Sequence, residues 1–467
     1  MTKGFTLLDK QQKAVDMIID WFENSNDNMF YMSGYAGTGK STVISTILHE
    51  IIEKIADSYE PIFNTPLNSE QLEELKYKYA NSKVHVACPT GKAVNVIQEN
   101  LKRDGLEDVK VSTIHGFAFK PYSYKKRKVL KKSKMKSALE KGAIVVKNND
   151  NRYDIADDEV IVEEEKLGFI PKAREDVEKT ALLIIDEASM LKKKMFDDVI
   201  HYNIKILFVG DTAQLPPVDE NFKDVNILGE PDILLDEVVR QKGELLSLSE
   251  GVRKGYKLQK YRSESGNVNI ITRDEFMNDP DLRVRLYHHV DQVICGRNET
   301  RHILNNEIRF VLGYKDKYPQ VGEKVICMKN HKGVYIGGIE LVNGLIGHVV
   351  DVDISDMKNV TRLDLPQSKE EFVFDMTFRP LGVPNRYKQA LNVSTLPFTE
   401  KKVLGSHMHS SPHDFFEFGY AITCHKSQGS EWDNVLIIEE NINPKTHKNW
   451  LYTAITRAKK SVTIVIQ

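Results

Sequence analysis

Residues 30–48, FYMSGYAGTGKSTVISTIL, constrain the fold of this chain more than any other stretch. An apolar run at residues 30–32 predicts a short buried strand. A glycine-rich loop follows, and beyond it apolar residues recur at helical spacing. In this order of strand, loop and helix, backbone N–H groups and the helix N-terminus can hold a polyphosphate. The stretch therefore predicts an α/β fold organised around a bound nucleotide.

The loop has the spacing of a phosphate-binding motif. Lys40 can reach the β and γ phosphates, and the Ser41 hydroxyl can ligate magnesium. The alternative is an ordinary glycine-rich turn, which the flanking strand and helix disfavour. ATP and Mg²⁺ are therefore the predicted ligands. The residues expected to bind the nucleotide here are Gly34, Tyr35, Ala36, Gly37, Thr38, Gly39, Lys40, Ser41 and Thr42.

Length and composition limit the class of protein. A chain of 467 residues predicts about two to four domains. The net charge of −2 means that any nucleic-acid site must be a local basic surface. Four cysteines without CxxC spacing are typical of reduced, buried thiols and not of metal ligands. With no signal-peptide core and no long apolar run, we expect a cytoplasmic protein without a membrane partner.

Two adjacent carboxylates follow a second buried strand. The apolar run at residues 181–185 predicts a central parallel strand, and Asp186 and Glu187 come directly after it. The first carboxylate can hold magnesium, and the second can accept a proton from an attacking water. The alternative, a solvated acidic turn, is disfavoured after so apolar a strand.

Two polar residues farther along can act on the γ-phosphate. Gln214 follows a third apolar strand, at residues 204–209, and can bond a γ-phosphate or the attacking water. Arg240 is a candidate arginine for a phosphoryl-transfer transition state. Taken alone, Arg240 would be a surface arginine.

An amphipathic helix is predicted upstream of the loop, at residues 7–22, with Asp9 as its cap. Gln11 and Gln12 open this helix. A glutamine amide offers both a donor and an acceptor, which suits the edge of an adenine ring. A solvated helix face is the alternative.

A second α/β unit is expected from about residue 241. Strands are predicted at residues 292–296, 435–438 and 462–466, and helices at 299–311 and 450–458. Arg457 lies in this second unit and would reach the γ-phosphate across a cleft if the unit closes over the nucleotide. That geometry would couple hydrolysis to movement of two lobes.

Two segments interrupt these units. Residues 117–178 contain nine Lys/Arg between 120 and 136 and seven Asp/Glu between 154 and 165, which favours a β-hairpin with a basic and an acidic arm. Its basic arm can track DNA phosphates, or the two arms can pair with each other in a solvated loop. Residues 321–418 show short strand signals and a predicted hairpin turn at Asn343-Gly344, typical of a small barrel.

The motifs, taken in order, resemble those of superfamily 1 helicases. LLDKQ, GYAGTGKST, ACPTGKA, STIHG, LLIIDEAS, VGDTAQLPPV, EVVRQ, CHKSQGSEW and YTAITRAK span nearly the whole chain. GDTAQLPPV, with STIHG before the insertion, is similar to the RecD-like branch (superfamily 1B), whose members move 5′ to 3′. The resemblance implies an α/β fold of two tandem RecA-like P-loop NTPase domains, with a hairpin inserted in the first and a barrel in the second.

The resemblance also implies roles for single residues. It assigns adenine recognition to Gln11 and contact with the nucleotide sugar to Glu431. It makes Asp186 the magnesium ligand and Glu187 the general base. The γ-phosphate sensor and arginine fingers are then Gln214, Arg240 and Arg457, and the positions that track the DNA strand are Thr90, Thr113, His115, His425 and Ser427. Without the resemblance, a lone histidine such as His115 is more often structural.

The implied domains are residues 1–116 and 179–240 for the first RecA-like domain, 117–178 for the hairpin, 241–320 and 419–467 for the second RecA-like domain, and 321–418 for the barrel. The expected function is ATP-dependent unwinding of DNA, with single-stranded DNA, duplex junctions and replication or single-strand-binding proteins as partners. Two alternatives stay open, an RNA-directed translocase and a nucleotide-switched binding protein that separates no strands. A small-molecule kinase is disfavoured because it would not need Gln428 and Arg457 in a second unit.

Overall fold

The computed structural model describes residues 6–60, 68–135, 144–146, 158–217, 229–239, 243–331, 333–360, 371–399, 408 and 411–467. The chain forms two compact units, the first from residues 1–117, 174–315 and 419–467 and the second from 118–173 and 316–418. Within the described ranges, every helix is too short or too polar to cross a membrane.

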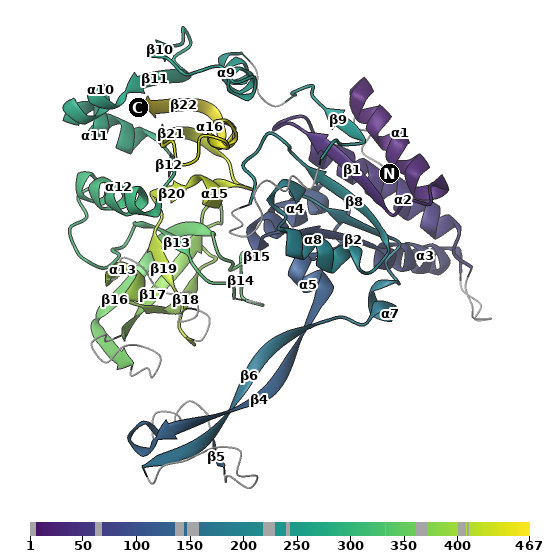
Figure 1. The fold of residues 1–467 in the computed structure, drawn as a ribbon, viewed down its shortest axis with the longest axis horizontal. Coiled ribbons are helices and arrows are strands. Elements are labelled where there is room, and N and C mark those ends of the chain that lie inside the picture. The colour runs from purple at the N-terminus through teal and green to yellow at the C-terminus, as the bar shows by residue number, and fades with distance from the viewer. Residues whose placement is uncertain are drawn as a thin grey trace. The chain divides into compact units, whose positions relative to one another are not determined.

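The first unit contains two sheets, and the phosphate loop belongs to the first of them. This sheet is wholly parallel, with the strand order β3-β2-β7-β8-β1-β9 among the described residues (Figure 1). Its strands are β1 (Met29–Gly34), β2 (Val84–Cys88), β3 (Lys110–Thr113), β7 (Leu182–Ile185), β8 (Lys205–Gly210) and β9 (Ile233–Leu235). The three strands predicted at residues 30–32, 181–185 and 204–209 are confirmed.

Helices cover both faces of this sheet. Alternate strand residues such as Phe30 and Met32 form one core with apolar side chains of α1, α2 and α4. On the opposite face, Phe208 packs against Phe196 of α8, with ring centroids 5.4 Å apart. The helical segments are α1 (Asp9–Asn24), α2 (Lys40–Asp57), α3 (Ser69–Lys83), α4 (Gly91–Arg103), α5 (Ile114–Ala118), α7 (Arg174–Val177), α8 (Lys193–Ile200) and the 3₁₀ turn η2 (Ala188–Met190).

The start of α1 differs from the prediction. Asp9 is already the first helical residue, and Leu8 holds the capping position. The Leu8 N–H donates to the Gln11 side-chain oxygen at 2.9 Å, so a residue inside the helix reaches back to satisfy its end. Asp9 therefore is not the cap, and its carboxylate in the first turn acts only on the helix dipole.

The second sheet of the first unit has the order β10-β11-β22-β21-β12-β20. All its pairs are parallel except β10 with β11. Its strands are β10 (Tyr261–Arg262), β11 (Val268–Thr272), β12 (Gln292–Cys295), β20 (Ala421–Thr423), β21 (Trp432–Ile438) and β22 (Ala458–Ile466). The associated helices are α9 (Glu244–Arg253), α10 (Arg273–Asn278), α11 (Pro280–His289), α12 (Asn298–Val311), α15 (Cys424–Ser427) and α16 (His447–Ile455). Two parallel α/β sheets confirm the predicted fold class.

One predicted helix boundary in this sheet is wrong. The helix expected at residues 450–458 ends at Ile455, and β22 already begins at Ala458. Ala458 pairs with Trp432 at the edge of β21. Strand pairing therefore overrides the helical propensity of this segment.

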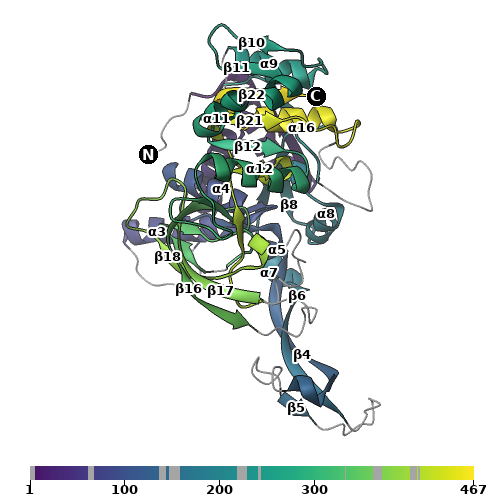
Figure 2. The same ribbon diagram turned by 90° about the vertical axis from the view of Figure 1, so that its left-hand side faces the viewer.

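The second unit contains the predicted hairpin. β4 (Phe119–Lys131) and β6 (Glu159–Pro171) pair antiparallel along their whole length, and β5 (Ile144–Val146) adds to β6. Figures 1 and 2 show β4 and β6 as a long twisted ribbon. Lys126 is the register partner of Glu164, and the Lys131 and Asp158 side chains lie 4.0 Å apart. The hairpin is confirmed, and its register supports pairing between the basic and acidic arms.

The second unit also contains an antiparallel sheet of order β18-β17-β16-β13-β19. Its edges are joined by Asp414, whose N–H donates to the Asn392 carbonyl at 2.8 Å and whose carbonyl accepts from Ser394 at 2.9 Å. This closure agrees with the predicted barrel. Its elements are β13 (Lys324–Cys327), β14 (Tyr335–Ile336), β15 (Ile339–Glu340), β16 (Ile346–Val360), β17 (Glu371–Pro380), β18 (Gln389–Ser394), α13 (Leu396–Thr399) and β19 (Phe416–Phe418).

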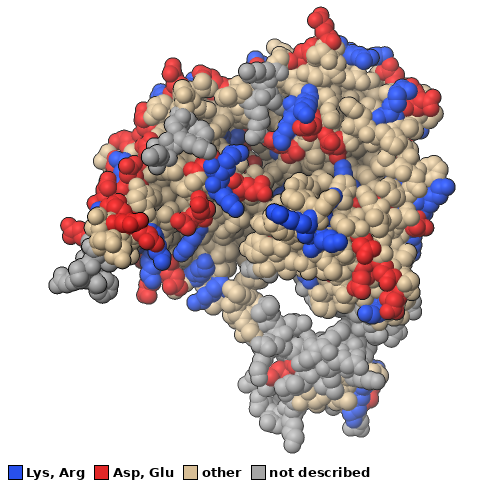
Figure 3. All heavy atoms as spheres, turned by 180° about the vertical axis from the view of Figure 1, so that it is seen from behind, with Lys and Arg blue, Asp and Glu red and all other residues tan. Residues whose placement is uncertain are grey.

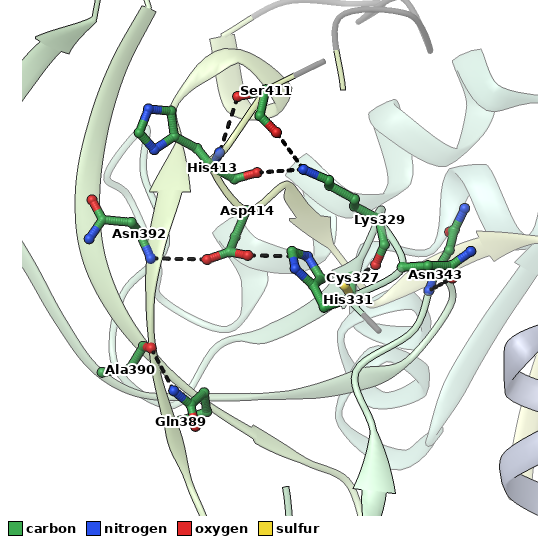
Figure 4. A network of polar contacts seen from close by, with 11 residues as sticks. Cys327, Lys329, His331, Asn343, Gln389, Ala390, Asn392, Ser411, His413 and Asp414 are labelled. Atoms are coloured by element: carbon green, nitrogen blue, oxygen red, sulfur yellow. Dashed lines mark hydrogen bonds and ion pairs between the residues drawn. The ribbon is translucent and has the colours of Figure 1, made fainter. Parts of the chain in front are cut away.

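Polar side chains hold the closing segment of this barrel (Figure 4). The Asp414 carboxylate accepts from the Asn392 N–H at 3.0 Å and lies 3.1 Å from His331. Lys329 donates to the Ser411 carbonyl at 2.5 Å. Burial raises the pKa of Asp414 to about 6 and lowers that of His331 to about 4. These contacts hold residues 411–414 between β18, through Asn392, and the segment that follows β13, through Lys329 and His331.

The predicted hairpin at Asn343-Gly344 is wrong. Gly344 has a φ of 91°, so the chain does turn there. However, the flanking strands do not pair with each other, since β15 pairs with β14 and β16 pairs with β13. The Gly344 N–H instead donates to Cys327 at 2.8 Å, which places the turn against β13.

Candidate nucleotide site

The phosphate loop joins β1 to α2 and turns at two glycines. Gly37 and Gly39 have φ values of 78° and 81°, which side chains rarely allow. The Lys40 ammonium donates to the carbonyls of Gly34 at 2.6 Å and Tyr35 at 3.2 Å. The cation therefore lies inside the loop, where a phosphate would meet it at the N-terminus of α2.

Gln11 braces this loop from α1. Its side-chain nitrogen donates to the Thr38 carbonyl at 2.9 Å, and its oxygen accepts from Leu8. A Cβ built on Gly39 would lie 2.4 Å from the Gln11 side-chain nitrogen, so an alanine at this position would displace the end of the Gln11 side chain. Gln12 bonds Asp16 on the exposed side of the helix. The Gln11 nitrogen thus holds the loop, while its oxygen caps the start of α1.

The two predicted carboxylates lie at the end of β7. The Asp186 N–H donates to the Ala87 carbonyl at 3.0 Å, so the hydrogen bonding between β7 and β2 continues one residue beyond the end of β7. The Glu187 N–H donates to the Asp186 side chain at 2.9 Å. Glu187 has a left-handed backbone, with φ 55°, and the described residues offer no hydrogen bond to its buried Oε2. A strained backbone that presents an unsatisfied carboxylate oxygen is typical of a functional position.

The electrostatics of this pair fit a divalent cation. Burial and the neighbouring Glu187 charge raise the pKa of Asp186 to about 7, and the Lys40 cation opposes the rise. A nearby cation would restore the ionised form. The Asp186 carboxylate and the Ser41 hydroxyl are hard oxygen donors of the kind Mg²⁺ prefers. The described residues form no cluster of three or more His, Cys, Asp or Glu side chains that could hold a metal ion.

Gln214 lies on the loop after β8. Asp211 organises this loop, since its carboxylate accepts from the Ala213 N–H at 2.9 Å and from the Gln214 side chain at 3.5 Å. The Gln214 side chain is buried, and its oxygen has no hydrogen bond within the described part of the chain. An acceptor is therefore left over for a water or another donor.

Side chains of the second sheet contact both loops. From α16, the Tyr452 hydroxyl bonds Ala36, the Thr453 hydroxyl accepts from the Leu215 N–H at 2.7 Å, and Asn449 donates to the Ala213 carbonyl at 3.0 Å. Sequence reasoning did not assign these α16 residues, although Tyr452 and Thr453 stand in the YTAITRAK motif. Only their contacts reveal them.

Arg457 is buried among elements of the second sheet. Its guanidinium donates to the Thr453 carbonyl at 3.0 Å, the Ser430 carbonyl at 3.2 Å and the Thr456 hydroxyl at 3.1 Å. Glu431 lies 3.8 Å from Lys459. Arg240 falls outside the described residues. These contacts of Arg457 and Glu431 thus all lie within the second half of the chain.

Lys92 is held among other cations. Its ammonium lies 5.6 Å from the Trp432 ring centroid. Partial burial, and then the charges of Arg457 and Lys426, lower the pKa of Lys92 to about 7.

The predicted DNA-tracking residues have different surroundings. Thr90 caps α4 by accepting from Ala93 at 3.2 Å, and Thr113 accepts from Gly116 at 3.1 Å. His115 is exposed. The first two hydroxyls thus support local turns, while their backbones stay at the C-terminal edge of the sheet.

On α15, burial lowers the pKa of the partly buried His425. Ser427 is fully buried and donates to the Cys424 carbonyl at 2.7 Å. The Ser427 side chain is therefore not at the surface. Figure 3 shows Lys/Arg and Asp/Glu interspersed among the described residues of the face drawn there.

The cysteine prediction is confirmed, since all four are free and buried. Burial raises the pKa of each of Cys88, Cys295 and Cys424. These thiols therefore stay protonated and serve the cores.

Comparisons with known proteins agree with this architecture. A family model described as an AAA domain matches residues 6–273, more than half of the chain, and a UvrD-like helicase C-terminal domain matches residues 418–465. An uncharacterised protein of Acanthamoeba polyphaga mimivirus is 22% identical, over 98% of this chain and 99% of that protein.

Two characterised relatives are similar as well. The ATP-dependent RecD2 DNA helicase of Deinococcus radiodurans is 24% identical over 60% of this chain. The matched region spans only 35% of that protein. The crystal structure of the Pif1 helicase from Candida albicans has a TM-score of 0.50 and 17% identity, covering 99% of this chain and 95% of that one. The latter likeness concerns the fold.

Two parallel sheets, with a phosphate loop and carboxylates at the strand ends of the first, define a P-loop NTPase with two RecA-like folds. The chain belongs to the AAA domain family. The ordered motifs resemble those of superfamily 1 helicases, and the match to a UvrD-like helicase C-terminal domain spans the last two of them, CHKSQGSEW and YTAITRAK.

Proposed function

We propose that this protein is an ATP-dependent DNA helicase that moves 5′ to 3′ along single-stranded DNA and separates duplexes by Mg²⁺-dependent ATP hydrolysis. One observation carries the proposal. Side chains of α16 bond the phosphate loop and the loop after β8, both of which belong to the other sheet. A nucleotide that alters either loop then changes the contacts between the two sheets, which is the coupling a translocating motor requires.

Each residue of the site has a chemical task in this proposal. Lys40 and the loop N–H groups bind the phosphates, while Ser41 and Asp186 hold Mg²⁺. Bound Mg²⁺ supplies charge neutralisation for the phosphates. Glu187 takes a proton from the attacking water, and its buried Oε2, to which the described part of the chain offers no hydrogen bond, supports that task. Gln214 orients the water with its free oxygen.

Further residues are assigned to nucleotide binding and to contact with DNA. Gln11 braces the loop and reads adenine, and Glu431 contacts the sugar. Arg240 and Arg457 stabilise charge on the γ-phosphate, the latter after leaving its present carbonyl partners. The DNA backbone runs past Thr90, Thr113, His115 and His425, with Ser427 shaping the turn that carries His425. The helicase match of residues 418–465 supports this division.

The proposed domain boundaries follow the same scheme. Residues 1–116 and 179–240 form the first RecA-like domain, 241–320 and 419–467 the second, with the hairpin at 117–178 and the barrel at 321–418. A cytoplasmic location, where thiols stay reduced, is part of the proposal and fits four free cysteines.

Unwinding of tailed duplexes tests the proposal directly. A duplex with a single-stranded 5′ tail should be separated in the presence of ATP and Mg²⁺, and one with a 3′ tail of equal length should not. Chelation of Mg²⁺ should stop the reaction. Preference for the 3′ tail would overturn the polarity, and ATPase activity without separation of either substrate would favour a nucleotide-switched binding protein.

The alternative function, an RNA-directed translocase, can be distinguished from a DNA helicase by one measurement of ATPase stimulation. Backbone-tracking residues need not distinguish the two sugars. The ATPase should therefore be measured with DNA and RNA oligonucleotides of the same sequence. If RNA stimulates the ATPase more strongly than DNA does, the substrate would be RNA and not DNA.

A further inference from the structure

The Tyr452 hydroxyl lies where the two sheets of the first unit meet. It is buried, with the residue 3% exposed. The hydroxyl accepts from the Ala36 N–H at 2.9 Å and donates to the Asp211 carboxylate at 3.0 Å. Burial and the Asp211 charge raise the pKa of Tyr452, so the hydroxyl keeps its proton. One side chain from α16 therefore connects the phosphate loop and the loop that carries Gln214.

The Ala36 N–H, which donates to the Tyr452 hydroxyl, is also a possible donor to a bound phosphate. Ala36 lies inside the phosphate loop, whose backbone N–H groups bind phosphate oxygens. In this structure, the acceptor for the Ala36 N–H is the Tyr452 hydroxyl, a side-chain group of the other sheet. A phosphate oxygen and the Tyr452 oxygen are acceptors of the same kind and compete for one donor.

An independent contact holds the same half of the loop. The Arg253 guanidinium, at the end of α9, lies 3.8 Å from the centroid of the Tyr35 ring. Tyr35 directly precedes Ala36. Two consecutive loop residues are thus held by two different helices of the second sheet.

The other end of the link reaches the Gln214 loop. Asp211 accepts from the Ala213 N–H as well as from Tyr452. The neighbouring Thr453 hydroxyl accepts from Leu215 of the same loop. A displacement of Tyr452 therefore acts on the acceptor that orders this loop.

We propose that Tyr452 is a positioning residue through which the second sheet detects whether the phosphate loop is occupied. Its hydroxyl holds the Ala36 N–H when no nucleotide is bound and yields that donor to a phosphate when ATP binds. The exchange releases α16 from the phosphate loop while its bonds to the Gln214 loop persist. This inference rests on the proposed ATP-driven function, because it describes how occupancy of the loop changes the sheet contacts.

The experiment measures coupling between nucleotide and DNA. The dissociation constant of a fluorescent single-stranded DNA is measured by anisotropy, with and without a non-hydrolysable ATP analogue and Mg²⁺, and the ratio of the two constants is the coupling. In Tyr452→Phe the ratio should move toward one by about threefold to tenfold, the worth of one net hydrogen bond. The analogue itself should bind as tightly or more tightly, because the Ala36 N–H is already free.

Tyr287→Phe is the matched control. Tyr287, on α11, is 4% exposed, so this variant loses an equally buried hydroxyl away from the loop, and it should keep the wild-type ratio. If Tyr452→Phe melts far below the wild type, Asp211→Asn weakens the same link from its other end and should show the same loss of coupling. A wild-type ratio in both variants overturns the inference.

Failure of the proposed function gives a different result. A wild-type protein with a ratio of one and no DNA-stimulated ATPase would contradict the proposed function itself. A wild-type ratio different from one that survives in Tyr452→Phe would contradict the role of Tyr452 alone.

Discussion

At the scale of single residues, Glu187 shows how backbone geometry prepares a side chain for chemistry. Its left-handed φ of 55° costs on the order of 1 kcal/mol in a non-glycine residue. The strain is kept where the chain leaves the buried strand β7, and the resulting carboxylate has a buried oxygen without a hydrogen bond. Both features fit the general-base role that we propose for Glu187.

Glu187→Gln tests this reading. The amide keeps the shape but cannot accept a proton, so ATP turnover should fall by about 10²–10⁴-fold while ATP binding persists. Single-stranded-DNA-stimulated ATPase and binding of a fluorescent ATP analogue measure the two quantities. Lys40→Ala is the contrasting variant and should also weaken binding, because it removes the loop cation. Lost binding in Glu187→Gln would instead indicate a folding role.

The charged form of Lys92 lowers the stability of the folded protein. Its folded-state pKa is about 7, against 10.5 for a free lysine. Between these values the unfolded chain binds more protons, so folding stability rises with pH across this window. Below about pH 7 the penalty is fully present, because the folded protein must hold the charged ammonium beside Arg457 and Lys426.

Lys92→Met should therefore stabilise the protein in a pH-dependent way. We expect a gain of about 1–3 kcal/mol at pH 6.5, discounted for partial exposure, which shrinks toward pH 10. Denaturant unfolding at both pH values measures it. Lys102→Met, on the exposed side of the same helix, should show no such dependence. An equal gain at both pH values would refute the charge argument.

At the scale of elements, the phosphate loop is formed jointly by β1, α2 and α1. Gln11 of α1 occupies the space beside Gly39 and bonds the Thr38 carbonyl. A loop that binds through its backbone has few side chains to hold it in place, so a neighbouring helix supplies the contact. The glycine requirement at position 39 thus has a tertiary cause as well as a conformational one.

Gly39→Ala and Gly105→Ala separate these two causes. Both glycines have φ near 80°, at 81° and 79°, but only at Gly39 would a Cβ meet another atom within 3 Å. Each alanine should cost about 1 kcal/mol of unfolding free energy for the backbone. Gly39→Ala should cost roughly 1–2 kcal/mol more for the displaced Gln11 bonds and weaken ATP-analogue binding. Equal stability and equal binding in the two variants would contradict the bracing role of Gln11.

At the scale of the whole molecule, the hairpin is a self-contained addition. Its strands pair with each other from Phe119 with Pro171 to Lys131 with Glu159, and Lys172 bonds Ala118 at its base. Within the described residues its third strand, β5, pairs only with β6. Removing it would leave no broken sheet in the first unit.

Replacing residues 120–170 by a short Gly-Ser link should therefore separate two activities. The ATPase stimulated by single-stranded DNA should stay near the wild-type rate, because the site lies wholly in the first unit. Unwinding of a 5′-tailed duplex should be lost if the ribbon divides the strands. A truncated protein that unwinds normally would assign strand separation to another part of the chain.

The sequence by itself determined the sheet strands, the phosphate loop, the carboxylates after β7 and the presence of a charged hairpin. These follow from local periodicity and from motifs that are contiguous along the chain. Local patterns failed where distant strands competed, as at Ala458, which pairs with Trp432, and at Gly344, which lies against β13.

Only the tertiary structure decided which residues join the two sheets. Tyr452 stands 416 positions from Ala36, yet it bonds the loop that opens the chain's nucleotide site. Arg457, predicted to face that site, instead bonds carbonyls of its own sheet. Motifs specify the chemistry of a residue, whereas packing and hydrogen-bond satisfaction decide its partner, since the large majority of buried polar groups are hydrogen-bonded.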